Sequence, residues 1–127
     1  MGYHIVNPSN VEPLPNRPSE ARPICGATTD APRFDHLGIR VYRPEPGEQI
    51  PSNYHYHDTQ EEAFYVLDGT MHVETPEREY VVEQGTFFLV EGGNPHRAFN
   101  PADAAGPIQV IAMGAPTDDK GHHYEPR

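Results

Sequence analysis

Four residues that can bind a metal ion lie in two short stretches of this 127-residue chain. His55 and His57 are separated by one tyrosine, Glu62 follows soon after them, and His96 comes directly after residues 92–95, which read Gly-Gly-Asn-Pro. Imidazoles and carboxylates together form mixed nitrogen and oxygen sites, which suit first-row transition metals. On an octahedral ion, such a ligand set leaves positions open for water or a substrate.

A β-strand over residues 52–57 would bring the two neighbouring histidines together. Side chains alternate faces along a strand, so His55 and His57 would point the same way, with Cα atoms about 7 Å apart. Imidazoles at that spacing can converge on one ion about 2.1 Å from each nitrogen. The next strand opens with Glu61 and Glu62, and alternation allows only one of them to face inward. Periodicity leaves this choice open, because both give an apolar set of inward residues.

The segments that must position these residues are short strands separated by turn residues. They are rich in Val, Ile, Tyr, Phe and Thr, and no segment combines an apolar period of 3.6 residues with a cap at each end. Asp68-Gly69 is typical of a β-hairpin. This pattern predicts an all-β sandwich or barrel. The predicted strands cover residues 36–42, 52–57, 62–67, 70–75, 78–82, 86–91, 96–100 and 108–114.

Outside these strands the chain divides into two flanking segments. Residues 7–23 contain five prolines, which forbid a regular helix and disfavour a central strand. We therefore expect a partly extended N-terminal arm over residues 1–35, with residues 3–6 as a short strand, then a barrel over 36–115 and a polar, loose tail over 116–127. Apolar residues within the arm favour docking on the barrel over disorder.

The formal net charge of −10 restricts the partners of the chain. Phosphate backbones and anionic membranes would be repelled, so we expect neither nucleic acid nor a membrane as a partner. An acidic chain whose only lysine is Lys120 also suits high salt, which is a hypothesis of halophilic adaptation. The first residues lack an apolar signal segment, no long apolar run follows, and Cys25 is the only cysteine. These features predict a cytoplasmic protein without an internal disulfide.

Residues 47–69 and 85–100 resemble the two signature motifs of the cupin superfamily. The first motif is a glycine, a His-X-His pair, a glutamate and a second glycine, matched here by Gly47, His55, His57, Glu62 and Gly69. The second motif is a glycine, a Pro-X-Gly turn, a histidine and an asparagine, matched by Gly85, Glu91-Gly92-Gly93, His96 and Asn100.

The spacing of the first motif selects Glu62 over Glu61, because six residues separate the family's glutamate from its second glycine. The chain departs from the family in two places. Seven residues separate Gly47 from His55, a longer run than is usual, and Glu91 stands where proline is usual. The second departure alters a turn and adds charge near the barrel mouth, but it removes no ligand.

The resemblance implies a double-stranded β-helix, which is a jelly-roll barrel. It implies one divalent metal ion (Fe, Mn, Ni, Co, Cu or Zn) with His55, His57, Glu62 and His96 as its ligands. It also implies a small-molecule ligand or substrate and a homodimer.

Four further residues are candidates for the lining of the pocket, namely Phe64, Phe88, Ala98 and Arg40. Arg40 could bind a substrate carboxylate, because a guanidinium matches the geometry of that group. We expect an enzyme of the dioxygenase type or of the isomerase or lyase type, in which Glu62 could also move a proton. The alternative is a non-catalytic, metal-stabilised module that binds or senses a small ligand, because a fold does not fix a function.

Overall fold

The computed structural model describes residues 2–27 and 31–126, without the side chain of Ser52. The only helix in these ranges is the short 3-10 turn η1 (Pro8–Asn10), and no helix among them is long and apolar enough to cross a membrane. The strands are β1 (Glu20–Cys25), β2 (Gly38–Arg43), β3 (Gln49–His57), β4 (Glu61–Asp68), β5 (Met71–Glu74), β6 (Glu79–Val82), β7 (Phe87–Val90), β8 (His96–Phe99), β9 (Gln109–Ala115) and β10 (Gly121–His123).

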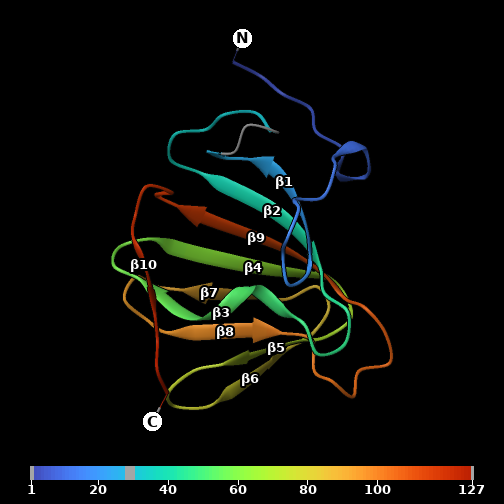
Figure 1. Ribbon diagram of the computed structural model, residues 1–127, viewed down its shortest axis with the longest axis vertical. Helices are drawn as coiled ribbons and strands as arrows, with labels where there is room; N and C mark the ends of the chain where they lie inside the picture. The colour runs from blue at the N-terminus through green and yellow to red at the C-terminus, as the bar shows by residue number, and fades with distance from the viewer. Residues whose placement is uncertain (1, 28–30, 127) are drawn as a thin grey trace.

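The strands form two five-stranded antiparallel sheets, which lie one over the other (Figure 1). The first sheet has the order β1-β2-β9-β4-β7, and the second has the order β10-β3-β8-β5-β6. Consecutive strands repeatedly change sheet, as in a jelly roll. The all-β fold and the eight predicted strands are therefore confirmed, with ends that differ by at most a few residues.

The core lies between the two sheets and follows the alternation of each strand. On β4 the buried apolar residues are Phe64 and Val66, and on β5 and β8 they are Met71, Val73 and Ala98. These side chains belong to one hydrophobic cluster. Burial of one face on every central strand fixes the register, because a one-residue slip would expose that face.

Asp68-Gly69 forms a tight turn, but the predicted hairpin is wrong. The turn joins β4 of the first sheet to β5 of the second, so the flanking strands do not pair with each other. Gly69 has a φ of 84°, as the turn requires. Its position against Ile108 leaves no room for a side chain.

The N-terminal segment contributes a strand that its proline content argued against. Residues 20–25 form β1 at the edge of the first sheet, where Pro23 is tolerated because an edge strand has a row of unpaired backbone groups. Residues 3–6 form no strand, so that prediction is wrong. The remaining boundaries of the arm stay a prediction, and residues 1 and 28–30 lie outside the described residues.

We predict a loose C-terminal tail, but part of this segment forms a strand. Residues 121–123 form β10, which pairs with β3. His122 supports this pairing, because its ring stacks on Tyr56 and its Nε2 lies 3.0 Å from the Asp58 carboxylate. Residue 127 lies outside the described residues.

The homodimer stays a prediction, and the exposed Phe87 and Leu89 offer an apolar surface for it.

Two glycines with similar backbone geometry test the packing of the turn after β4. Gly69 and Gly85 have φ values of 84° and 79°, but only a Cβ at Gly69 would collide with Ile108. We expect Gly69→Ala to destabilise the fold by about 2–5 kcal/mol, from left-handed strain of roughly 1–2 and overpacking of roughly 1–3. Gly85→Ala should show only the strain. Denaturant unfolding measures both, and equal losses would contradict the packing at Ile108.

Candidate metal centre

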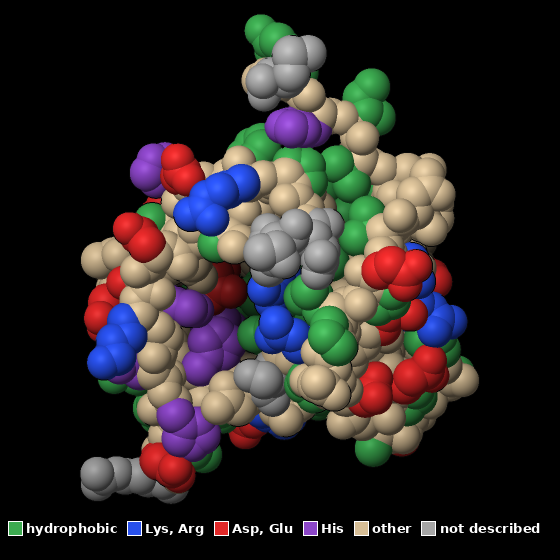
Figure 2. Space-filling view, turned by 45° about the horizontal axis from the view of Figure 1, so that its top comes forward, with side chains coloured by type: hydrophobic (Ala, Val, Ile, Leu, Met, Phe, Trp, Pro, Cys, Tyr) green, Lys and Arg blue, Asp and Glu red, His purple; other side chains and the backbone are tan. Residues whose placement is uncertain are grey.

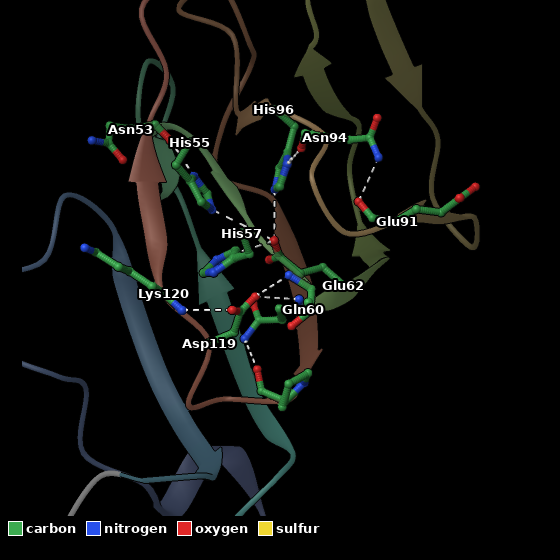
Figure 3. Close-up of polar contacts among 12 residues, drawn as sticks. Asn53, His55, His57, Gln60, Glu62, Glu91, Asn94, His96, Asp119 and Lys120 are labelled. Carbon is green, nitrogen blue, oxygen red and sulfur yellow. Dashed lines mark hydrogen bonds and ion pairs between the residues drawn. The ribbon is translucent and has the colours of Figure 1, made fainter.

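Both sheets contribute side chains to one histidine and glutamate cluster at the end of the barrel (Figure 3). His55 and His57 lie on β3, and His96 lies at the start of β8, which pairs with β3 so that His55 and His96 are direct cross-strand partners. Glu62 comes from β4 in the facing sheet. The carboxylate therefore meets the three imidazoles across the interior of the barrel.

The four side chains lie at distances that suit a shared ion. Glu62 Oε1 is 3.2 Å from His96 Nε2, 3.8 Å from His57 Nε2 and 3.9 Å from His55 Nε2. Ligand atoms of His55, Glu62 and His96 all lie within 4.8 Å of one another, and His57 lies beside this group. Ligands about 2.1 Å from one ion are about 3–4 Å apart, so the cluster needs little movement to bind one.

Backbone carbonyls hold two of the imidazoles in the orientation that metal binding requires. His55 Nδ1 lies 2.8 Å from the carbonyl oxygen of Asn53, and His96 Nδ1 lies 3.0 Å from that of Asn94. Each Nδ1–H therefore donates to a carbonyl, which leaves the Nε2 lone pair facing Glu62. Among the described residues, the buried His96 Nε2 has no aligned hydrogen-bond partner despite its proximity to Glu62. A metal ion would satisfy this atom.

The cluster borders a cavity of about 310 Å³ that opens to the surface. Figure 2 shows the hollow, in which histidine side chains face basic ones with a carboxylate deeper between them. His55, His57 and Glu62 contribute to its wall together with Arg40 and Tyr42. The site therefore combines metal-binding groups with a cation and space for a small molecule.

The architecture and the ligand set both agree with the protein family whose model matches this sequence. Residues 40–113 match the family model Cupin_2, described as a cupin domain, over more than half of the chain. The chain is a cupin. The match includes all four predicted metal ligands.

Three similar proteins align with nearly the whole chain of this cupin. Protein SchB of Streptomyces halstedii is 31% identical over 120 residues, which are 93% of this chain and 83% of that protein. The polyketide synthase CurC of Streptomyces cyaneus is 25% identical over 123 residues, 96% of this chain and 77% of that protein. The structure of the polyketide cyclase RemF from Streptomyces resistomycificus superimposes with a TM-score of 0.76 at 17% identity, covering 98% of this chain and 87% of that one.

The structure resolves the choice between the two glutamates at the start of β4. Glu62 faces the interior with Phe64 and Val66, and only 11% of its side chain is exposed. Glu61 faces outward and is exposed. This is the orientation that the motif spacing selects.

The predicted pocket residues lie in different places. Arg40 lines the cavity beside the cluster. Phe64 and Ala98 are fully buried in the core, where the Phe64 and His96 rings meet edge to face with 5.9 Å between their centroids. Phe88 packs against Tyr80. A contact of these three apolar residues with a ligand stays a prediction, because none of them borders the cavity that holds Arg40.

Burial and charge act against each other on the titratable groups of the cluster. Burial raises the pKa of Glu62, but the surrounding imidazoles outweigh it and hold that pKa below its usual value. Burial lowers the pKa of His96, but Glu62 outweighs it and raises the net value. Burial lowers the pKa of His55, which favours its neutral form. The carboxylate is therefore ionised, and a bound metal would compete with a proton for His96 Nε2.

The sequence did not indicate the residues that hold the turn between His57 and Glu62. Gln60 lines the cavity, and the backbone N–H groups of Thr59 and Gln60 donate to Asp119, 60 and 59 residues away. No local pattern identifies a contact at that separation. The only signal was the turn-like composition of residues 58–60 itself.

Removal of one ligand tests the centre. We expect wild-type protein to bind one divalent ion per chain, and His96→Ala to lower the affinity by about 100-fold or more, because even loss of a partner behind a ligand costs roughly 10–100-fold. His72→Ala is the matched control, since His72 pairs with Glu79 outside the centre. Isothermal titration with Zn²⁺ or Co²⁺ measures both. Equal affinity of His96→Ala and wild type would contradict the site.

Proposed function

We propose that this cupin is a metal-dependent enzyme that acts on a small oxygenated molecule of the polyketide type. The observation that carries the proposal is the cavity in which Arg40 and Tyr42 share one space with His55, His57 and Glu62. Two similar proteins, CurC and RemF, are named as a polyketide synthase and a polyketide cyclase, which supports this substrate class.

A divalent ion bound at this cluster would keep a net positive charge and could therefore attract an anionic substrate. A divalent ion held by His55, His57, Glu62 and His96 would supply Lewis acidity, which polarises a substrate oxygen. Three neutral imidazoles and one carboxylate leave a net positive charge on the occupied site. The pKa of Glu62 lies below its usual value, so its carboxylate is ionised and can serve as an anionic ligand.

Arg40 is placed to bind the negative charge that develops on such a substrate. In a β-polyketone, a carbon next to a carbonyl loses a proton to water in the open cavity, and its electrons move onto that carbonyl oxygen, forming an enolate. The enolate carbon then attacks another carbonyl of the same chain to close a six-membered ring. The resulting alkoxide takes up a proton from water, and loss of one water molecule completes the ring. Among the described residues Arg40 forms no ion pair, and its Nη1 lies 3.4 Å from the hydroxyl of Tyr42. Its guanidinium can therefore pair with the enolate or with a carboxylate.

The rest of the wall suits the hydrocarbon part of a small ring. Cys25, Pro51, Ala112 and Met113 line the cavity beside the polar groups. A volume of about 310 Å³ is at the lower end of the usual range for ligand pockets, which is roughly 300–1,000 Å³. The site would therefore accept a small substrate or one end of a longer one.

Turnover of a model polyketone tests this function. We expect metal-loaded wild type to convert a linear 1,3,5-triketone into an aromatic product, followed by ultraviolet absorbance, with oxygen uptake measured in parallel to detect dioxygenation. Arg40→Gln should lower kcat/KM by about 10–100-fold, as expected for loss of a hydrogen bond to a charged group. Arg43→Gln is the control, because Arg43 is an exposed residue of the same strand paired with Glu45.

The contrary result is equally specific. Stoichiometric metal without turnover of triketones, sugar phosphates or small acids would contradict an enzymatic role. It would favour the metal-stabilised module that binds or senses a small ligand.

A further inference from the structure

The turn between the strands that carry His57 and Glu62 is held by the C-terminal segment (Figure 3). Asp119 Oδ2 accepts hydrogen bonds from the backbone N–H groups of Thr59 at 2.6 Å and Gln60 at 2.7 Å. These donors lower the pKa of Asp119 below its usual value, so the carboxylate is ionised and both bonds are charge-assisted.

The side chain of Gln60 makes a second attachment to the same part of the chain. Its Nε2 donates to the carbonyl oxygen of Pro116 at 2.7 Å. Its amide also lies against Gly114 on β9, where an added Cβ would come within 3.1 Å of Gln60 Cδ. Both the backbone and the side chain of the turn are thus bound to residues 114–119.

On its other side, the turn contacts the loop that delivers His96. Gly92 packs directly on Thr59, since an added Cβ would come within 3.0 Å of the Thr59 backbone. The N–H of Gly93 donates to the carbonyl oxygen of His57 at 2.6 Å. The turn therefore lies between the C-terminal segment and the His96 loop, and movement of it would displace ligands on three strands.

The same C-terminal segment also packs on a ligand directly. Gly121 on β10 is the register partner of His57 on β3, and an added Cβ there would come within 3.3 Å of the His57 ring. Asp119 is two residues before this contact. Attachment of the turn and support of the His57 imidazole are therefore functions of one short stretch of chain.

We propose that Asp119 is a positioning residue for the metal centre, whose carboxylate fixes the turn at residues 58–60 and so sets the separation of His57 and Glu62. This inference rests on the metal site in the proposed function. Because coupling is reciprocal, metal binding and attachment of the C-terminal segment stabilise each other.

The test uses the full chain with Co²⁺ as the probe. We expect Asp119→Ala to lower Co²⁺ affinity by about 10–100-fold, as for other partners behind metal ligands, and to change the visible absorption spectrum of the bound ion. Asp119→Asn should be intermediate, since an amide oxygen still accepts both N–H bonds but carries no charge. The exposed neighbour gives the control, Asp118→Ala, which should match wild type.

Amide hydrogen exchange provides a second readout that does not depend on activity. In wild type, Co²⁺ should slow exchange at Thr59, Gln60 and residues 121–123, and Asp119→Ala should abolish this protection. Wild-type affinity, spectrum and protection in Asp119→Ala would overturn the role of Asp119 while the metal site stands. A wild-type chain that binds no Co²⁺ would overturn the proposed metal site and this inference together.

Discussion

The carboxylate of Glu62 lies among three imidazoles that reach it from the opposite sheet, and this contact constrains the surrounding structure. A buried carboxylate is costly unless charges or hydrogen bonds compensate it. The pairing of β3 with β8 provides that compensation, because it makes His55 and His96 cross-strand partners that face β4. Any slip of register between these strands would separate the imidazoles and leave the carboxylate unpaired.

The cavity beside this contact is lined in part by small residues of the central strand β9. In the first sheet, Gly114 lies between Gly38 and Glu62 in register, and Ala112 lies between Arg40 and Phe64. Side chains in register across a sheet share one face, so the arginine and the glutamate project into the same interior space. Two strand spacings of about 4.8 Å separate their strands. Gln60 packs over Gly114, whereas the small side chain of Ala112 beside Arg40 leaves room for a ligand.

Much of this arrangement could be predicted from local sequence. Strand alternation placed His55 and His57 on one face, and motif spacing chose Glu62, which the structure shows facing inward. The pairing of β1 with β2 and that of β10 with β3 could not be predicted. These polar or proline-containing segments join their sheets through backbone hydrogen bonds, which need no apolar pattern. The contact of Asp119 with the β3–β4 turn escaped prediction for the same reason.

Anomalous X-ray diffraction from crystals of the full chain grown with Co²⁺ tests the central claim most directly. The account predicts one strong peak per chain, at coordination distance from His55 Nε2, His57 Nε2, His96 Nε2 and a carboxylate oxygen of Glu62. A peak elsewhere on the chain, or none at this cluster under saturating Co²⁺, would contradict it.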